Sequence, residues 1–130
     1  MARAYTIATA ALALDVNTKW LDNTLSHFRI DGVLQARQGI ARRLTVESLT
    51  ILSVTVVLTH TLEVPLGPAI LIAHRLVASG GRYLGDDTLE LRIDLPALHS
   101  RLLERLERAV EIAPVPRRGR PPRNTTGRLD

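Results

Sequence analysis

The hydrophobic and polar positions at the start of the chain follow the period of two short α-helices. The first helix is predicted at residues 7–14 with Thr6 as its N-cap, and the second follows Asn17. Between them, Asp15 tolerates the left-handed backbone of a tight turn, and Val16 supplies an apolar side chain to cover it. Two short helices joined in this way form a helix-turn-helix. The inward positions are Ile7, Ala10, Ala11, Leu14, Trp20, Leu21, Thr24, Leu25 and Phe28, and the outward ones are Thr18, Lys19, Asp22, Asn23 and His27.

After Phe28 the helical pattern stops and turn signals appear. Asp31-Gly32 and Gln38-Gly39 predict a β-hairpin whose tip lies near residues 38 and 39. Thr45 then caps a helix that carries Glu47 in its first turn, where the helix dipole favours an acid. The β-branched residues of this segment favour a strand, whereas its length and cap favour a helix buried on most sides. We predict the helix, with Leu49, Leu52, Val56 and Leu62 inward.

The second half of the chain predicts a helix, another hairpin and a long final helix. Pro65 and Pro68 belong to the first turn of a helix that ends near Ser79, before two glycines. Alternating apolar residues and the turn residues at 85–87 predict a hairpin over residues 82–94. Asp94 caps the final helix, which runs to about residue 113. Its apolar stripe, which serves either as core or as a dimer seam, comprises Leu98, Leu102, Leu103, Leu106, Val110 and Ala113.

The predicted fold is therefore mainly α with small β-hairpins: a winged helix-turn-helix, a helix pair, a second hairpin and a C-terminal helix. With 130 residues, 45% of them hydrophobic, the chain suits one modest core. It contains no cysteine, which excludes disulfides, thiolate metal sites and cysteine nucleophiles, and a cytoplasmic location is the default expectation. Its apolar runs are shorter than the roughly 20 residues of a membrane span. The four histidines lack ligand spacing, and we predict neither metal, cofactor nor catalytic site, hence no enzyme.

Charge is distributed unevenly along the chain, which carries a formal net charge of +4. Residues 1–43 hold six basic and three acidic side chains, residues 44–95 hold three and six, and residues 96–130 hold eight and four. The basic excess is greatest in the predicted first hairpin and from Pro114 onward. Local patches of this kind attract phosphates, although codon bias in a GC-rich genome also enriches arginine.

Three segments in order resemble the MerR superfamily of winged helix-turn-helix proteins: "YTIATAALALDVNTKWL", "ARRLTVESLTIL" and "LEVPLGPAI". The resemblance covers Tyr5 to about Ala78 and rests on the order of the elements more than on any single motif. It implies double-stranded DNA as the ligand, with the second helix in the major groove and the wing along the backbone or minor groove. Lys19 and Arg42-Arg43 fall where the family carries basic contacts, whereas Asp22 occupies a position commonly held by arginine.

We therefore predict a sequence-specific, DNA-binding transcriptional regulator that associates with the nucleoid in the cytoplasm. Residues 1–78 form the DNA-binding domain, residues 79–113 mediate dimerisation or bind a protein partner, and residues 114–130 form a disordered basic tail. Arg118-Gly119-Arg120-Pro121 in that tail resembles the core of an AT-hook, although a plain basic tail is an equal alternative. The predicted DNA-binding residues are Thr18, Lys19, Asn23, His27, Arg29, Gln35, Arg37, Gln38, Arg42, Arg43, Arg118 and Arg120.

Two other functions fit the same pattern. An antitoxin-like protein would bind its own promoter through the N-terminal half and a toxin through residues 79–113. An excisionase-like or architectural protein would bend DNA without reading an operator. From the family resemblance we expect a homodimer, since MerR-like regulators pair through a C-terminal helix.

Overall fold

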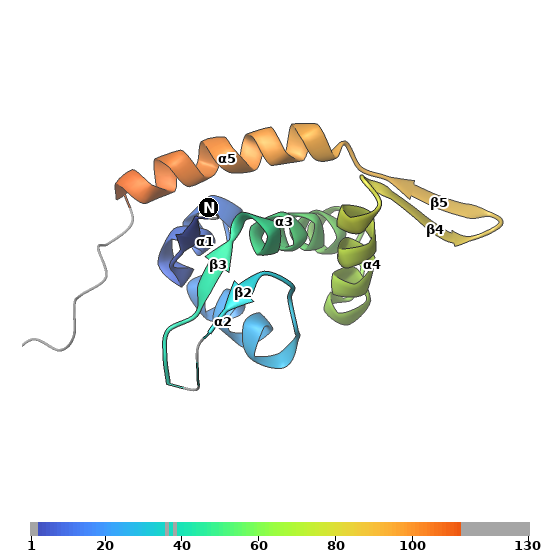
Figure 1. Ribbon diagram of the computed structural model, residues 1–130. Coiled ribbons are helices and arrows are strands. Elements are labelled where there is room, and N and C mark those ends of the chain that lie inside the picture. The colour runs from blue at the N-terminus through green and yellow to red at the C-terminus, as the bar shows by residue number, and fades with distance from the viewer. Residues whose placement is uncertain (1–2, 36, 38, 113–130) are drawn as a thin grey trace, which may run out of the picture.

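The computed structural model describes residues 3–112 except positions 36 and 38, and it confirms the mainly helical fold with small antiparallel hairpins. The elements are β1 (Ala4–Tyr5), α1 (Ile7–Leu14), α2 (Thr18–His27), β2 (Val33–Leu34), β3 (Arg43–Thr45), α3 (Val46–Thr61), α4 (Leu66–Ala78), β4 (Arg82–Asp86), β5 (Leu89–Arg92) and α5 (Leu95–Ile112). In Figure 1, α5 lies along one side of the helical body, and the β4–β5 hairpin projects away from that body.

Local capping explains the first two helices, as the sequence predicted. The Thr6 hydroxyl accepts a hydrogen bond from the Thr9 N–H at 3.2 Å, and the Asn17 carboxamide oxygen accepts one from the Lys19 N–H at 2.7 Å. Asp15 has the predicted left-handed backbone, with φ of 56°. This turn lets the Val16 N–H reach the Ala11 carbonyl at 3.0 Å, so a carbonyl at the end of α1 is satisfied.

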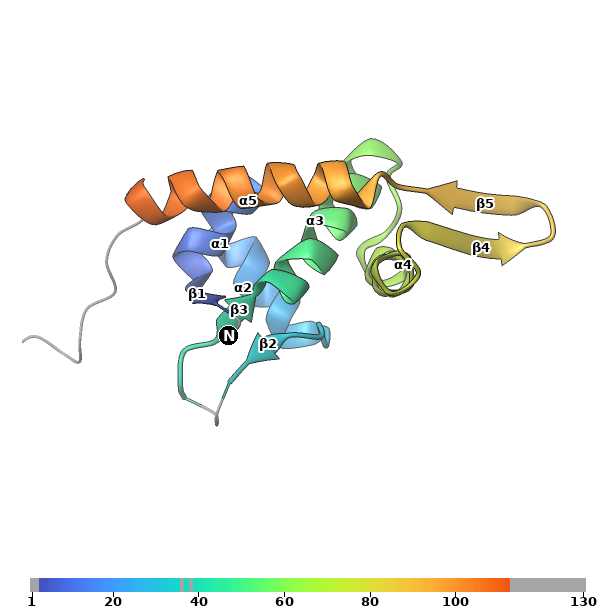
Figure 2. The same cartoon turned by 45° about the horizontal axis from the view of Figure 1, so that its top comes forward.

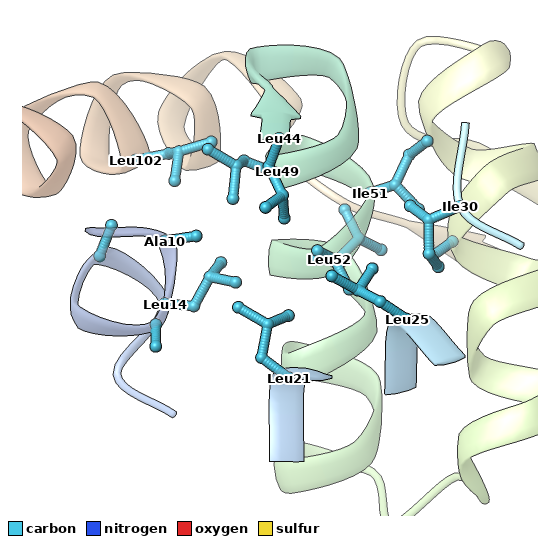
Figure 3. Close-up of a cluster of buried hydrophobic side chains, with 14 of the residues drawn as sticks. Ala10, Leu14, Leu21, Leu25, Ile30, Leu44, Leu49, Ile51, Leu52 and Leu102 are labelled. Atoms are coloured by element: carbon cyan, nitrogen blue, oxygen red, sulfur yellow. The ribbon is translucent and has the colours of Figure 1, made fainter. Parts of the chain in front are cut away.

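Helix α3 passes through the centre of the molecule, which resolves the choice between helix and strand in favour of the helix. Figure 3 shows Leu49 and Leu52 of α3 among leucines from the surrounding elements. Burial on most sides explains why its sequence lacks a clear polar face. The prediction that Leu62 faces inward was wrong, because α3 ends at Thr61 and the Leu62 side chain is 54% exposed.

Helix α5 packs against α1 and α3. Its buried residues are only partly those of the predicted stripe. Leu102 and Leu106 are buried as expected, and so is Ala109, which the prediction omitted. Leu103 and Val110 are each 42% exposed, because each lies about 80–100° around the helix from Leu102. The centre of the stripe is therefore core. The last predicted member, residue 113, lies outside the described residues.

The first hairpin belongs to a three-stranded sheet with the order β1-β3-β2. Leu44 of β3 pairs with Tyr5 on one side and Val33 on the other, and its side chain is fully buried. Strand β1 was not predicted, because two residues are too few to show an alternating pattern. It anchors the hairpin to the start of the chain and to the core.

Candidate nucleic-acid interface

The outer face of α2 presents polar side chains to solvent. Thr18, Lys19, Asn23 and His27 are all exposed, as predicted. Leu21, Thr24 and Leu25 on the other face are buried, and this fixes the rotation of the helix. The His27 Nδ1 lies 2.8 Å from the Asn23 carbonyl oxygen, which orients the imidazole along the helix. A convex helix with short polar and basic groups on its exposed face has the dimensions to enter a DNA major groove.

The hairpin formed by β2 and β3, called the wing below, presents basic side chains at the same end of the molecule as α2. Arg43 is exposed opposite Leu34, whereas its neighbour Leu44 points into the core. Arg37 is exposed in the connecting loop. The Gln35 carboxamide donates to the Ile40 carbonyl at 2.9 Å, so this side chain braces the loop. The predicted contact Gln38 lies outside the described residues, as do Arg118 and Arg120.

Arg42 connects the wing to α2. Its guanidinium donates to the Asp22 carboxylate at 3.0 Å and to the Ser26 hydroxyl at 3.4 Å. The Arg42 side chain is only 23% exposed, whereas that of Asp22 is 57% exposed. The sequence analysis predicted Arg42 as a DNA-binding residue and placed Asp22 on the outer face of the second helix, and the structure brings the two together. This contact explains the acid at position 22, because its carboxylate accepts a hydrogen bond from an arginine of the wing.

Arg29 follows α2 and lines a shallow pocket of about 540 Å³ with Gln35 and Arg42. His74 of α4 binds the adjoining backbone. Its Nε2 accepts a hydrogen bond from the Asp31 N–H at 3.2 Å, and its Nδ1 lies 2.9 Å from the Ile70 carbonyl oxygen. No local pattern indicated this role for His74, because its partner is 43 positions away. The contact fixes the segment between α2 and the wing.

Among the described residues, no group of three or more His, Cys, Asp or Glu side chains is arranged to hold a metal ion. None of the helices in that part of the chain combines the length and apolar character needed to cross a bilayer. The perturbed pKa values lie elsewhere: hydrogen bonds lower the pKa of Asp86 and Glu90 in the second hairpin.

No protein-family model, curated protein or solved structure that was compared with this chain gave a match. The resemblance to the MerR superfamily therefore stays a prediction from the order of the elements.

Proposed function

We propose that the protein binds double-stranded DNA in a sequence-specific manner and regulates transcription. The observation that carries this proposal is the ion pair between Arg42 and Asp22, which joins the wing to α2. The exposed polar face of one helix and the exposed arginines of a hairpin thus form one coupled surface. A helix and a wing held in a constant relation can contact a groove and the adjacent backbone together.

The side chains divide by chemistry into two kinds of contact. Lys19 and Asn23 on α2 have the donors and acceptors that read base edges, with Asn suited to adenine and Lys to guanine. Thr18 and His27 flank them on the exposed face. Arg29, Arg37 and Arg43 are exposed cations outside α2, and we assign them to phosphates. We assign Arg42 and Gln35 as positioning residues, because each donates a hydrogen bond within the protein, Arg42 to Asp22 and Gln35 to the Ile40 carbonyl.

A selection from random duplex DNA at two salt concentrations tests the proposal. We expect enrichment of one motif and an apparent affinity that falls as salt increases, because phosphate contacts release counterions. Equal binding to all sequences would replace the regulator by an architectural DNA-binding protein. Absence of both enrichment and salt dependence would overturn the proposal.

Variants separate the two kinds of contact. Arg43→Ala is expected to weaken binding similarly on all sequences and to reduce the salt slope by about 1. Asn23→Ala is expected to cost about 1–3 kcal/mol on the selected sequence and to relax the preference at one base pair. Arg108→Ala is the matched control, since this exposed arginine lies on α5, on the other side of the helical body from the wing (Figures 1 and 2).

A further inference from the structure

The β4–β5 hairpin contacts the rest of the described fold mainly through α4. Both views show it projecting beyond α4, which it touches at its base (Figures 1 and 2). There the Gly81 N–H donates to the Leu76 carbonyl at 2.7 Å, and the Ile93 N–H donates to the Gly81 carbonyl at 2.8 Å. A two-stranded hairpin alone is marginally stable in water. The part of the hairpin beyond its base is therefore a candidate surface for contact with another molecule.

The tip of the hairpin combines apolar and acidic side chains. Leu84 and Leu89 are 57% and 50% exposed. The register pairs Leu84 with Glu90, so these two side chains share one face of the hairpin. Leu89, one position before Glu90, lies on the opposite face, and each face of the tip therefore carries one exposed leucine. Asp86 and Asp87 are exposed between the two leucines. Hydrogen bonds from Thr88 lower the pKa of Asp86, which keeps its carboxylate charged.

A cleft lies between α1, α3 and α5, and residues 92–94 at the base of the hairpin complete its lining. Its volume is about 480 Å³, within the range of about 300–1,000 Å³ that ligand pockets span. Leu14, Val56 and Leu98 contribute apolar surface. Arg101 and Arg105 of α5 also line it, and neither forms an ion pair within the described part of the chain. Arg92, which is paired with Glu90, and the acid Asp94 line it as well, so the cleft offers apolar surface and an excess of positive charge.

We propose that the hairpin tip of one copy of this chain occupies the α1–α3–α5 cleft of a second copy. Leu84 and Leu89, on opposite faces of the tip, would contact apolar residues on the two sides of the cleft, while Asp86 and Asp87 would face Arg101 and Arg105. The tip does not fill its own cleft, because it points away from the helical body (Figure 1). A two-fold axis makes the exchange reciprocal, so that each copy supplies one hairpin and one cleft.

This arrangement differs from pairing through α5. The centre of the apolar stripe of α5, Leu102, Leu106 and Ala109, is already buried within the same chain. Opposite charges at the tip and the cleft select the hairpin as the occupant and fix its register. Where the proposed DNA binding also holds, the two-fold axis would present two α2 helices to inverted half-sites. The exchange itself does not depend on DNA.

Sedimentation equilibrium of the full chain without DNA tests the proposal. We expect a monomer–dimer equilibrium, and an increase of at least about tenfold in the dimer dissociation constant for Leu84→Ser/Leu89→Ser. Leu71→Ser is the matched control, because this leucine of α4 is 69% exposed but belongs to neither the hairpin nor the cleft. Arg101→Glu should also weaken the dimer, whereas Arg108→Glu, two helical turns along α5 and outside the cleft, should not. Circular dichroism of each variant checks that it folds.

A mixing experiment separates the exchange from any other dimer. When the Leu84→Ser/Leu89→Ser chain is mixed with an Arg101→Glu/Arg105→Glu chain, one intact hairpin meets one intact cleft. We expect the mixture to form more dimer than either variant alone. A monomeric wild-type chain at all concentrations, a dimer that the hairpin variant leaves unchanged, or a mixture with no gain over its components would each overturn the proposal.

Discussion

The two hairpins of this protein share local turn chemistry but differ in what surrounds them. The wing pairs with a third strand, buries Leu44 completely and is joined to α2 through Arg42. The β4–β5 hairpin has two strands and an acidic tip, and its ion pairs Arg82–Glu90 and Arg92–Glu90 join residues of the hairpin itself. The wing is thus part of the body, whereas the second hairpin is an arm. This difference arises from tertiary contacts.

The largest expected contrast concerns leucines in the two hairpins. Leu44→Ala removes a fully buried side chain and is expected to lower the free energy of unfolding by about 2–5 kcal/mol. Leu84→Ala in the arm is expected to change it by less than about 0.5 kcal/mol, because that side chain is more than half exposed. Urea unfolding of dilute samples measures both values. Equal effects would show that the arm is as integrated as the wing.

Glycines within the wing provide the next contrast. Gly32 has φ of 91°, and a Cβ there would approach the Ser48 backbone nitrogen to 2.9 Å and clash with the Thr45 hydroxyl. Gly39 has φ of 89° with open space around it. Gly32→Ala is therefore expected to destabilise the fold by about 2 kcal/mol or more, and Gly39→Ala by about 1 kcal/mol from backbone strain alone. Thermal unfolding of the two variants gives this order; a reversal would contradict the packing at the wing base.

A smaller effect is expected from the ion pairs. A double-mutant cycle on Arg42→Gln and Asp22→Asn should give a coupling of about 0.2–1 kcal/mol in stability, as for other exposed pairs. The effect on DNA affinity should be clearer, because the wing would lose its fixed relation to α2. The matched pair, Arg82→Gln and Glu90→Gln in the arm, should leave DNA affinity unchanged. If both pairs of substitutions lowered DNA affinity equally, Arg42 would have no special role in DNA binding.

The smallest expected effect is a pH dependence confined to the arm. Hydrogen bonds from Thr88 lower the pKa of Asp86, and those from Arg92 and Arg82 lower the pKa of Glu90. Because each folded-state pKa is depressed, the charged carboxylates stabilise the arm at neutral pH, and this contribution is lost as pH falls through the folded-state values. In a pH titration, the backbone NMR signals of residues 82–92 should change with midpoints below the ordinary pKa values of carboxylates. Unchanged signals there would contradict the hydrogen bonds.

Much of the local structure was predictable because its causes are local. The capping bonds of Thr6 and Asn17 and the left-handed turn at Asp15 involve residues within a few positions of each other. The left-handed Glu63 after α3 was not predicted, because glutamate carries no signal for that conformation. The short strand β1 was missed for the related reason that it forms only by pairing with β3, where Ala4 lies opposite Thr45 and Tyr5 opposite Leu44.

The candidate site divides in the same way. The sequence by itself determined the helix-turn-helix, the outward polar face of α2 and the basic wing, since these follow from periodicity, caps and turns. Only the tertiary structure decided that Arg42 meets Asp22, that His74 holds the Asp31 backbone, and that the centre of the α5 stripe is core. Those contacts join residues 20 or more positions apart, and a periodic pattern records which face is apolar without recording which element covers it.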